Sequence, residues 1–237
     1  MFTVALVGAD GAGKTTISRA LPAALPVPVK AIYMGVNLES GGPLLPSTRL
    51  LLALKRAHGK RPDLVAVPAR PGPAPAGRSA RAREGAKGVL RLAVWLSEEL
   101  FRQGLAWYHS RLRKEIVVFD RHFFADYYAY DIAQNGESRP FGRRLHGFFL
   151  RHVYPQPDLV VCLDAPGELL HHRKSEASPE WLERRRREYL RLRGVVPNFV
   201  RVDASQPLAE VTKEVAAAIM SFHAQAASSR RRRTDAT

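Results

Sequence analysis

A strand-like run followed at once by a glycine-rich loop, near the start of the chain, is the feature that most constrains the fold. The run from Val4 to Val7 is short, apolar and rich in β-branched residues, which is typical of a buried strand. It breaks at Gly8, and the residues from Gly8 to Thr15 fit the pattern G-x-x-x-x-G-K-[ST] at every fixed position. An amphipathic segment follows, so strand, loop and helix come in the order that this pattern requires.

The residue types of this loop suit a bound polyphosphate. Its glycines allow the backbone to turn its N–H groups toward an anion, and a helix that begins near Lys14 points its positive end at the same place. Lys14 supplies a cation for the outer phosphates, and Thr15 supplies a hydroxyl for Mg²⁺. We therefore expect a site for ATP formed by Gly8, Ala9, Asp10, Gly11, Ala12, Gly13, Lys14, Thr15 and Thr16.

The length of 237 residues, with 46% hydrophobic residues, predicts one α/β domain with a sizeable core over residues 1–225. No apolar run is long enough to span a membrane, and the chain enters a core strand with no room for a signal peptide, so we expect a cytoplasmic protein. Cys162, the single cysteine, lies in an apolar run and is expected to be a buried, inert thiol.

The net charge of +15 is concentrated in two segments. Residues 55–87 hold nine Lys or Arg and two Asp or Glu, and the tail adds four consecutive arginines from Arg230. Residues 59–86, with five prolines and four glycines, are expected to form a mobile or irregular insert, and residues 226–237 a disordered basic tail. Most of the excess charge is thus expected outside the folded core.

Strand and helix patterns alternate along the rest of the chain. Strands are expected at 27–34, 116–119, 159–163 and 199–202, and helices from Lys14 to about 21 and at 47–58, 89–114, 141–153, 167–174, 179–193 and 207–222. This alternation predicts a parallel sheet with helices on both faces and a ligand site where the strands end. Four aspartates that follow strands should then crowd one edge of the sheet: Asp10, Asp120, Asp164 and Asp203.

Asp120 closes a four-residue apolar strand, as expected of a carboxylate that holds Mg²⁺ directly or through water. Arg121 follows it, and a guanidinium at that place can bind a phosphate with two hydrogen bonds. A plain ion pair between Asp120 and Arg121 is the alternative.

The sequence resembles the thymidylate kinase family over most of its length, excepting residues 43–88 and the tail. The resemblance rests on the loop Gly8–Thr16 with Asp in its third place, on Asp120-Arg121-His122, and on Leu163-Asp164-Ala165-Pro166. It implies the P-loop NTPase fold, a three-layer α/β/α arrangement with a five-stranded parallel sheet and a helical lid over about 167–193. A homodimer is possible, since the long helix at 89–114 could serve an interface as well as a core.

The resemblance also implies transfer of a phosphoryl group from MgATP to a small acceptor. Lys14 would stabilise charge on the transferred group, and Thr15 and Asp120 would hold the metal. Arg121 would clamp a phosphate, and Arg173 on the lid would close over the triphosphate. Ala204 and Ser205 would lie near the adenine.

Departures from the family leave the acceptor open. The family's arginine after the second strand is missing from Leu38-Glu39-Ser40-Gly41-Gly42, and Ala125 stands where the family has Ser. The acceptor-binding residues expected here are Asp10, Glu39, Arg121, Phe124 and Tyr128. A nucleoside monophosphate, with dTMP converted to dTDP, needs cations, whereas a hydroxyl of a sugar or nucleoside needs a carboxylate base, for which Asp10 and Glu39 are the candidates.

An ATP-using protein that binds polynucleotide is the remaining class. The basic segment at 55–87 favours it, but this segment lacks interleaved aromatic residues for base stacking. Binding to nucleic acid that falls steeply with salt would support this class.

Overall fold

The computed structural model describes residues 1–34, 44–57, 93–94, 96–129 and 141–234. Its centre is a five-stranded sheet in which every pair of neighbours is parallel, in the order β2-β3-β1-β4-β5. The strands are β1 (Thr3–Val7), β2 (Val29–Tyr33), β3 (Ile116–Asp120), β4 (Leu159–Asp164) and β5 (Phe199–Asp203). The expected strands, their order along the chain and the parallel sheet are therefore confirmed.

The burial of each strand follows from its place in the sheet. Every residue of β3 and β4 is buried, which is why these strands are continuous apolar runs rather than alternating ones. β2 lies at one end of the sheet and begins only at Val29, one residue after Pro28. The carbonyl of Pro28 accepts a hydrogen bond from the N–H of Ile116, and the N–H that this proline lacks falls just before the strand begins.

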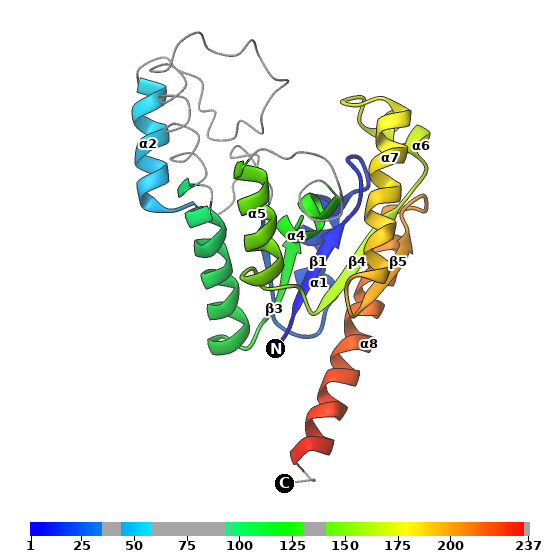
Figure 1. Ribbon diagram of the computed structural model, residues 1–237. Helices are drawn as coiled ribbons and strands as arrows, with labels where there is room; N and C mark the ends of the chain where they lie inside the picture. Colours follow the sequence, from blue (N-terminus) through cyan, green and yellow to red (C-terminus); the bar gives the residue numbers. More distant parts are fainter. Residues whose placement is uncertain (35–43, 58–92, 95, 130–140, 235–237) are drawn as a thin grey trace, which may run out of the picture.

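Helices pack on both faces of the sheet and form two hydrophobic cores. Val4 and Leu6 of β1 face one core, together with residues of α1 (Lys14–Ala24) and α8 (Leu208–Thr234). Ala5 and Val7 face the other, with residues of the helix at 96–107, α4 (Phe123–Tyr127) and α5 (Phe141–His152). Figure 1 shows α4 and α5 on the near side of the sheet and α8 extending well past it toward the C-terminus.

Two helices continue past their expected ends. α1 runs through Pro22 to Ala24, because a proline in the last turn removes only one backbone hydrogen bond. α8 ends at Thr234 rather than near 222, so residues 226–234, which we expected to be a disordered tail, are helical. Alanine and arginine, which fill much of that stretch, are strong helix formers, and their propensity favours the longer helix.

The helix over 93–94 and 96–107, which continues as the π-helix Tyr108–Leu112, leaves several large apolar side chains exposed. Leu100, Trp107 and Leu112 are exposed. The buried face instead carries three charged residues, Glu98, Glu99 and Arg102. Glu98 has a structural task, since its carboxylate accepts the N–H of Leu45 at 3.1 Å, just before α2 (Pro46–Ala57) begins.

After β4 the chain forms α6 (Gly167–Arg173), which packs on α7 (Pro179–Leu190). The short helix Arg191–Gly194 extends α7. Two arginines of α7 make contacts inside the fold. Arg185 is buried, and Arg186 holds the buried carboxylate of Asp164 with hydrogen bonds of 2.6 and 3.1 Å. Arg201 of β5 donates to the same carboxylate at 2.7 Å.

Two expectations drawn from composition can be compared with the structure. Cys162 is buried in β4, and burial raises the pKa of its thiol to about 12, which keeps the thiol protonated and unreactive. Among the described helices, none combines the length and apolar character that a membrane crossing requires. The insert expected at 59–86, Trp95 and Glu39 lie outside the described residues.

We predict that Asp164→Asn lowers the free energy of unfolding by about 3 kcal/mol, because it removes the buried charge that Arg186 and Arg201 share. Urea denaturation would measure the loss. Asp203→Asn is the matched control, because Asp203 lies in register with Asp164 on the neighbouring strand but is exposed, and an amide oxygen can still accept from Ser205. Equal losses in the two variants would contradict the assigned role of Asp164.

Candidate functional site

The loop between β1 and α1 has a backbone that only glycine can follow at its key positions. Gly8 and Gly11 have φ angles of 143° and 89°. A Cβ atom at Gly8 would collide with the carbonyl oxygen of Leu163, and one at Gly11 would lie 2.7 Å from that of Leu170. The loop is therefore pressed against the end of β4 and against α6, and its path is set before any ligand binds.

Lys14, the first residue of α1, lies inside this loop. Its Nζ donates to the carbonyls of Gly8 and Ala9 at 2.7 and 2.9 Å and lies 4.0 Å from a carboxylate oxygen of Asp10. Burial, reinforced by the charge of Arg121, lowers the pKa of Lys14 to about 8, even though nearby aspartates oppose the shift. The ammonium is thus held by dipoles rather than by a close ion pair, and a bound anion would stabilise its charged form.

Asp120 and Thr15 meet at the end of β3. Asp120 is buried, and its Oδ1 has no hydrogen-bond partner among the described residues. Burial raises the pKa of its carboxyl, and the nearby Thr15 side chain opposes that shift. A buried carboxylate oxygen without a partner, next to a hydroxyl, is the donor set that Mg²⁺ takes when phosphate oxygens complete its shell.

No cluster of three or more His, Cys, Asp or Glu side chains suited to a metal occurs within the described ranges. Thr15 and Asp120 are the described residues that could hold Mg²⁺. They would supply only some of its oxygen ligands, so other oxygens would have to complete the shell.

Arg121 joins the ends of β1 and β3. Its backbone is left-handed, with φ of 70°, and its N–H donates to Leu6 of β1 at 3.2 Å. Its guanidinium donates to Asp10 Oδ1 at 2.5 Å, so its close partner is Asp10 rather than the neighbouring Asp120. Burial alone would lower the pKa of Arg121, but the carboxylates of Asp126 and Asp10 outweigh it and raise that pKa.

Arg173, at the end of α6, lies on the other side of the loop. Its guanidinium donates to the carbonyls of Ala204 at 2.7 Å and Ser205 at 3.4 Å, in the turn between β5 and α8. Asp203 shapes that turn, because its Oδ1 accepts the N–H and the hydroxyl of Ser205 at 2.9 and 2.6 Å. Asp203 therefore stabilises the turn between β5 and α8, and neither of these hydrogen bonds reaches the loop between β1 and α1.

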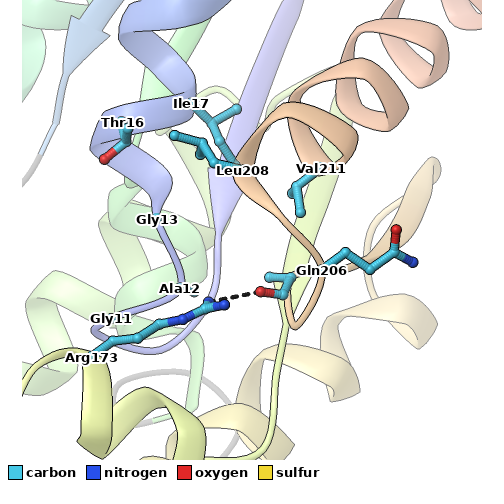
Figure 2. Close-up of a pocket in the computed structure, with 10 residues that line it drawn as sticks. Gly11, Ala12, Gly13, Thr16, Ile17, Arg173, Gln206, Leu208 and Val211 are labelled. Atoms are coloured by element: carbon cyan, nitrogen blue, oxygen red, sulfur yellow. Dashed lines mark hydrogen bonds between the residues drawn. The ribbon is translucent and has the colours of Figure 1, made fainter.

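A cavity of about 250 Å³ opens between the loop and this turn (Figure 2). Its lining residues are Gly11, Ala12, Gly13, Thr16, Ile17, Arg173, Ala204, Gln206, Leu208 and Val211. In Figure 2 the side chain of Arg173 extends beneath the loop toward the turn, and Ile17, Leu208 and Val211 form an apolar wall. A flat apolar group could bind against this wall, with an attached anion at the loop.

The described residues that we expected to bind the acceptor fall into two groups, one at the sheet edge and one in or near the second core. Asp10 and Arg121 are in contact at the sheet edge. Phe124 is buried in the second core, with its ring 5.5 Å from that of the half-buried Tyr128. Asp164, expected at the same edge, is occupied by Arg186 and Arg201 and has no part in this group.

Asp126 is the residue that sequence reasoning missed. It lies on α4, and its Oδ1 accepts the hydroxyl of Tyr189, which is on α7, at 2.7 Å. Its charge acts on both Lys14 and Arg121. The available signal was that Asp126 is the only charged residue in the aromatic run from Phe123 to Tyr130.

His122, which follows the Asp-Arg pair, is a core residue. Its ring lies 5.1 Å from Phe119 and 5.4 Å from Tyr154, and burial lowers its pKa to about 3. It therefore stays neutral at physiological pH and supports the turn that carries Arg121.

Comparison with known proteins adds no family to this geometry: no protein-family model matches the chain, and no curated protein matches it significantly.

We predict that the ammonium of Lys14 titrates near pH 8, well below the ordinary value of 10.5 for lysine. NMR of protein labelled at the lysine ε-carbon would measure it, and Lys14→Arg would identify the resonance by its loss. Below pH 8 the group is charged, and above it the group loses its proton. Added MgATP should raise the pKa, because a bound anion stabilises the charged form. A titration near 10.5 in the absence of nucleotide would contradict this environment.

Proposed function

We propose that the protein is a Mg²⁺-dependent kinase that transfers the γ-phosphoryl group of ATP to a small acceptor. The observation that carries the proposal is the meeting of Lys14, Thr15 and Asp120 at a glycine-shaped loop where parallel strands end. Phosphoryl transfer from a metal–triphosphate needs an ammonium, a hydroxyl and a carboxylate with an oxygen that can bind the metal. The strand order and the loop support a fold of the P-loop NTPase kind.

In this proposal each group has a separate task. The loop N–H groups and Lys14 bind the β- and γ-phosphates and stabilise charge on the transferred group. Thr15 and Asp120 hold Mg²⁺, which when bound neutralises phosphate charge. The cavity beside Arg173 takes the adenine, and the α6–α7 pair would act as the lid that the resemblance to thymidylate kinases implies.

The acceptor is a small molecule that enters on the side of Arg121 and Asp10. A nucleoside monophosphate, dTMP above all, is the acceptor that the family resemblance implies, and it stays a prediction. A screen that follows ADP release with dTMP, other monophosphates, nucleosides and sugars, one at a time, would identify the acceptor.

Lys14→Ala should lower the rate of ADP formation at least about 10²-fold, because it removes the cation that stabilises charge on the transferred group. The far-ultraviolet circular dichroism spectrum should not change. Lys213→Ala, at an exposed position of α8, is the matched control and should keep the full rate. Full activity in Lys14→Ala would refute the proposed function.

A further inference from the structure

A chain of hydrogen bonds fixes the carboxylate of Asp126 from the side of α7. Tyr189 donates its hydroxyl to Asp126 Oδ1 at 2.7 Å, and Arg185 donates to the Tyr189 hydroxyl at 2.9 Å. Arg185 also donates to the backbone carbonyl of Asp126 at 3.4 Å and to Glu188 at 2.6 Å. One oxygen of Asp126 is therefore oriented by a neutral hydroxyl, and the second has no hydrogen-bond partner among the described residues.

The charges around this point do not favour a second phosphate. Lys14 and Arg121 interact with three carboxylates, those of Asp10, Asp120 and Asp126. Arg173, a third cation beside the loop, lies on the cavity side and donates to the carbonyls of Ala204 and Ser205. Arg121 already donates to Asp10 at 2.5 Å. A phosphate acceptor would need cations beyond those that the triphosphate uses, and it would be repelled by the carboxylate of Asp126.

Two further cations nearby are also paired. Arg185 holds Glu188, and Lys174, whose charge acts on Asp10, lies 3.0 Å from Glu176. A neutral acceptor avoids the electrostatic cost of a second anion and gains a hydrogen bond from its hydroxyl to a carboxylate.

We propose, resting on the proposed kinase function, that the acceptor is an alcohol and that Asp126 binds its hydroxyl and takes its proton. The alcohol oxygen forms a bond to the γ-phosphorus of ATP while the bond from that phosphorus to the β,γ-bridging oxygen breaks. ADP leaves with the bond's electron pair. The hydroxyl proton passes to the Asp126 carboxylate and from there to solvent.

Asp126 suits this task better than Asp10. Asp10 Oδ1 already accepts a hydrogen bond from Arg121 at 2.5 Å and lies 4.0 Å from the Nζ of Lys14. The same two cations act on Asp126 over a longer distance. The side chain of Asp126 accepts instead from the uncharged hydroxyl of Tyr189, which orients it without an ion pair.

Water is the simplest hydroxyl acceptor, so slow ATP hydrolysis tests the proposal without knowledge of the acceptor. Asp126→Asn, which keeps the shape and can still accept from Tyr189, should lower kcat for hydrolysis about 10²-fold with KM for MgATP unchanged. Glu214→Gln, which removes a carboxylate at an exposed position of α8, is the matched control and should hydrolyse at the full rate. Tyr189→Phe should lower kcat less, because it only frees the orientation of Asp126.

A panel of ribose, glucose, glycerol and thymidine, run beside dTMP, dUMP and AMP, provides the second measurement. Turnover with any of the four alcohols, lost in Asp126→Asn, would support the proposal. Unchanged hydrolysis in Asp126→Asn, or a nucleoside diphosphate formed from a monophosphate, would overturn it while leaving the kinase assignment intact. A wild-type protein that fails to bind MgATP would instead overturn the kinase assignment itself.

Discussion

The ion pair between Asp10 and Arg121 is the interaction on which the candidate site depends. β1 and β3 are neighbours in a parallel sheet, so the loops that leave them start side by side, and this pair joins the two loops at 2.5 Å. The left-handed backbone of Arg121 directs its side chain there, at a cost in strain of about 1–3 kcal/mol that the surrounding contacts must offset. Because Asp10 belongs to the loop between β1 and α1, the pair also fixes how this loop lies against the end of β3.

Five aspartates near one edge of the sheet differ in function because their neighbours differ. Asp120 keeps a carboxylate oxygen without a partner, as a metal ligand would. Asp164 is equally buried, but two arginines satisfy it, so it stabilises the sheet. Asp203 is exposed and caps a turn, Asp10 binds Arg121, and Asp126 binds a neutral hydroxyl. Position at a strand end brings such residues to the site, and the neighbouring side chains then decide their chemistry.

The sequence predicted the sheet and the glycine-rich loop between β1 and α1 because their signals are local. Apolar runs such as Val4–Val7 and the spacing of Gly8, Gly13 and Lys14 depend on neighbours in the chain. The errors in side-chain burial have one cause, since long-range partners cannot be read from spacing. The helix at 96–107 buries Glu98 because Leu45 needs an acceptor, and Arg186 is drawn in by Asp164. Asp126 gained its importance only from Tyr189, which lies 63 positions later.

Two independent observations bear on the class of acceptor. The stretch Leu38-Glu39-Ser40-Gly41-Gly42 holds an acid and no arginine, where thymidylate kinases bind the acceptor phosphate with an arginine. Separately, at the ends of β1 and β3, Lys14 and Arg121 interact with three carboxylates, those of Asp10, Asp120 and Asp126. The first is a fact of composition and the second of geometry, and neither follows from the other. Both lower the affinity expected for a dianionic acceptor and raise that for a neutral alcohol, whose hydroxyl needs a carboxylate before it can attack phosphorus.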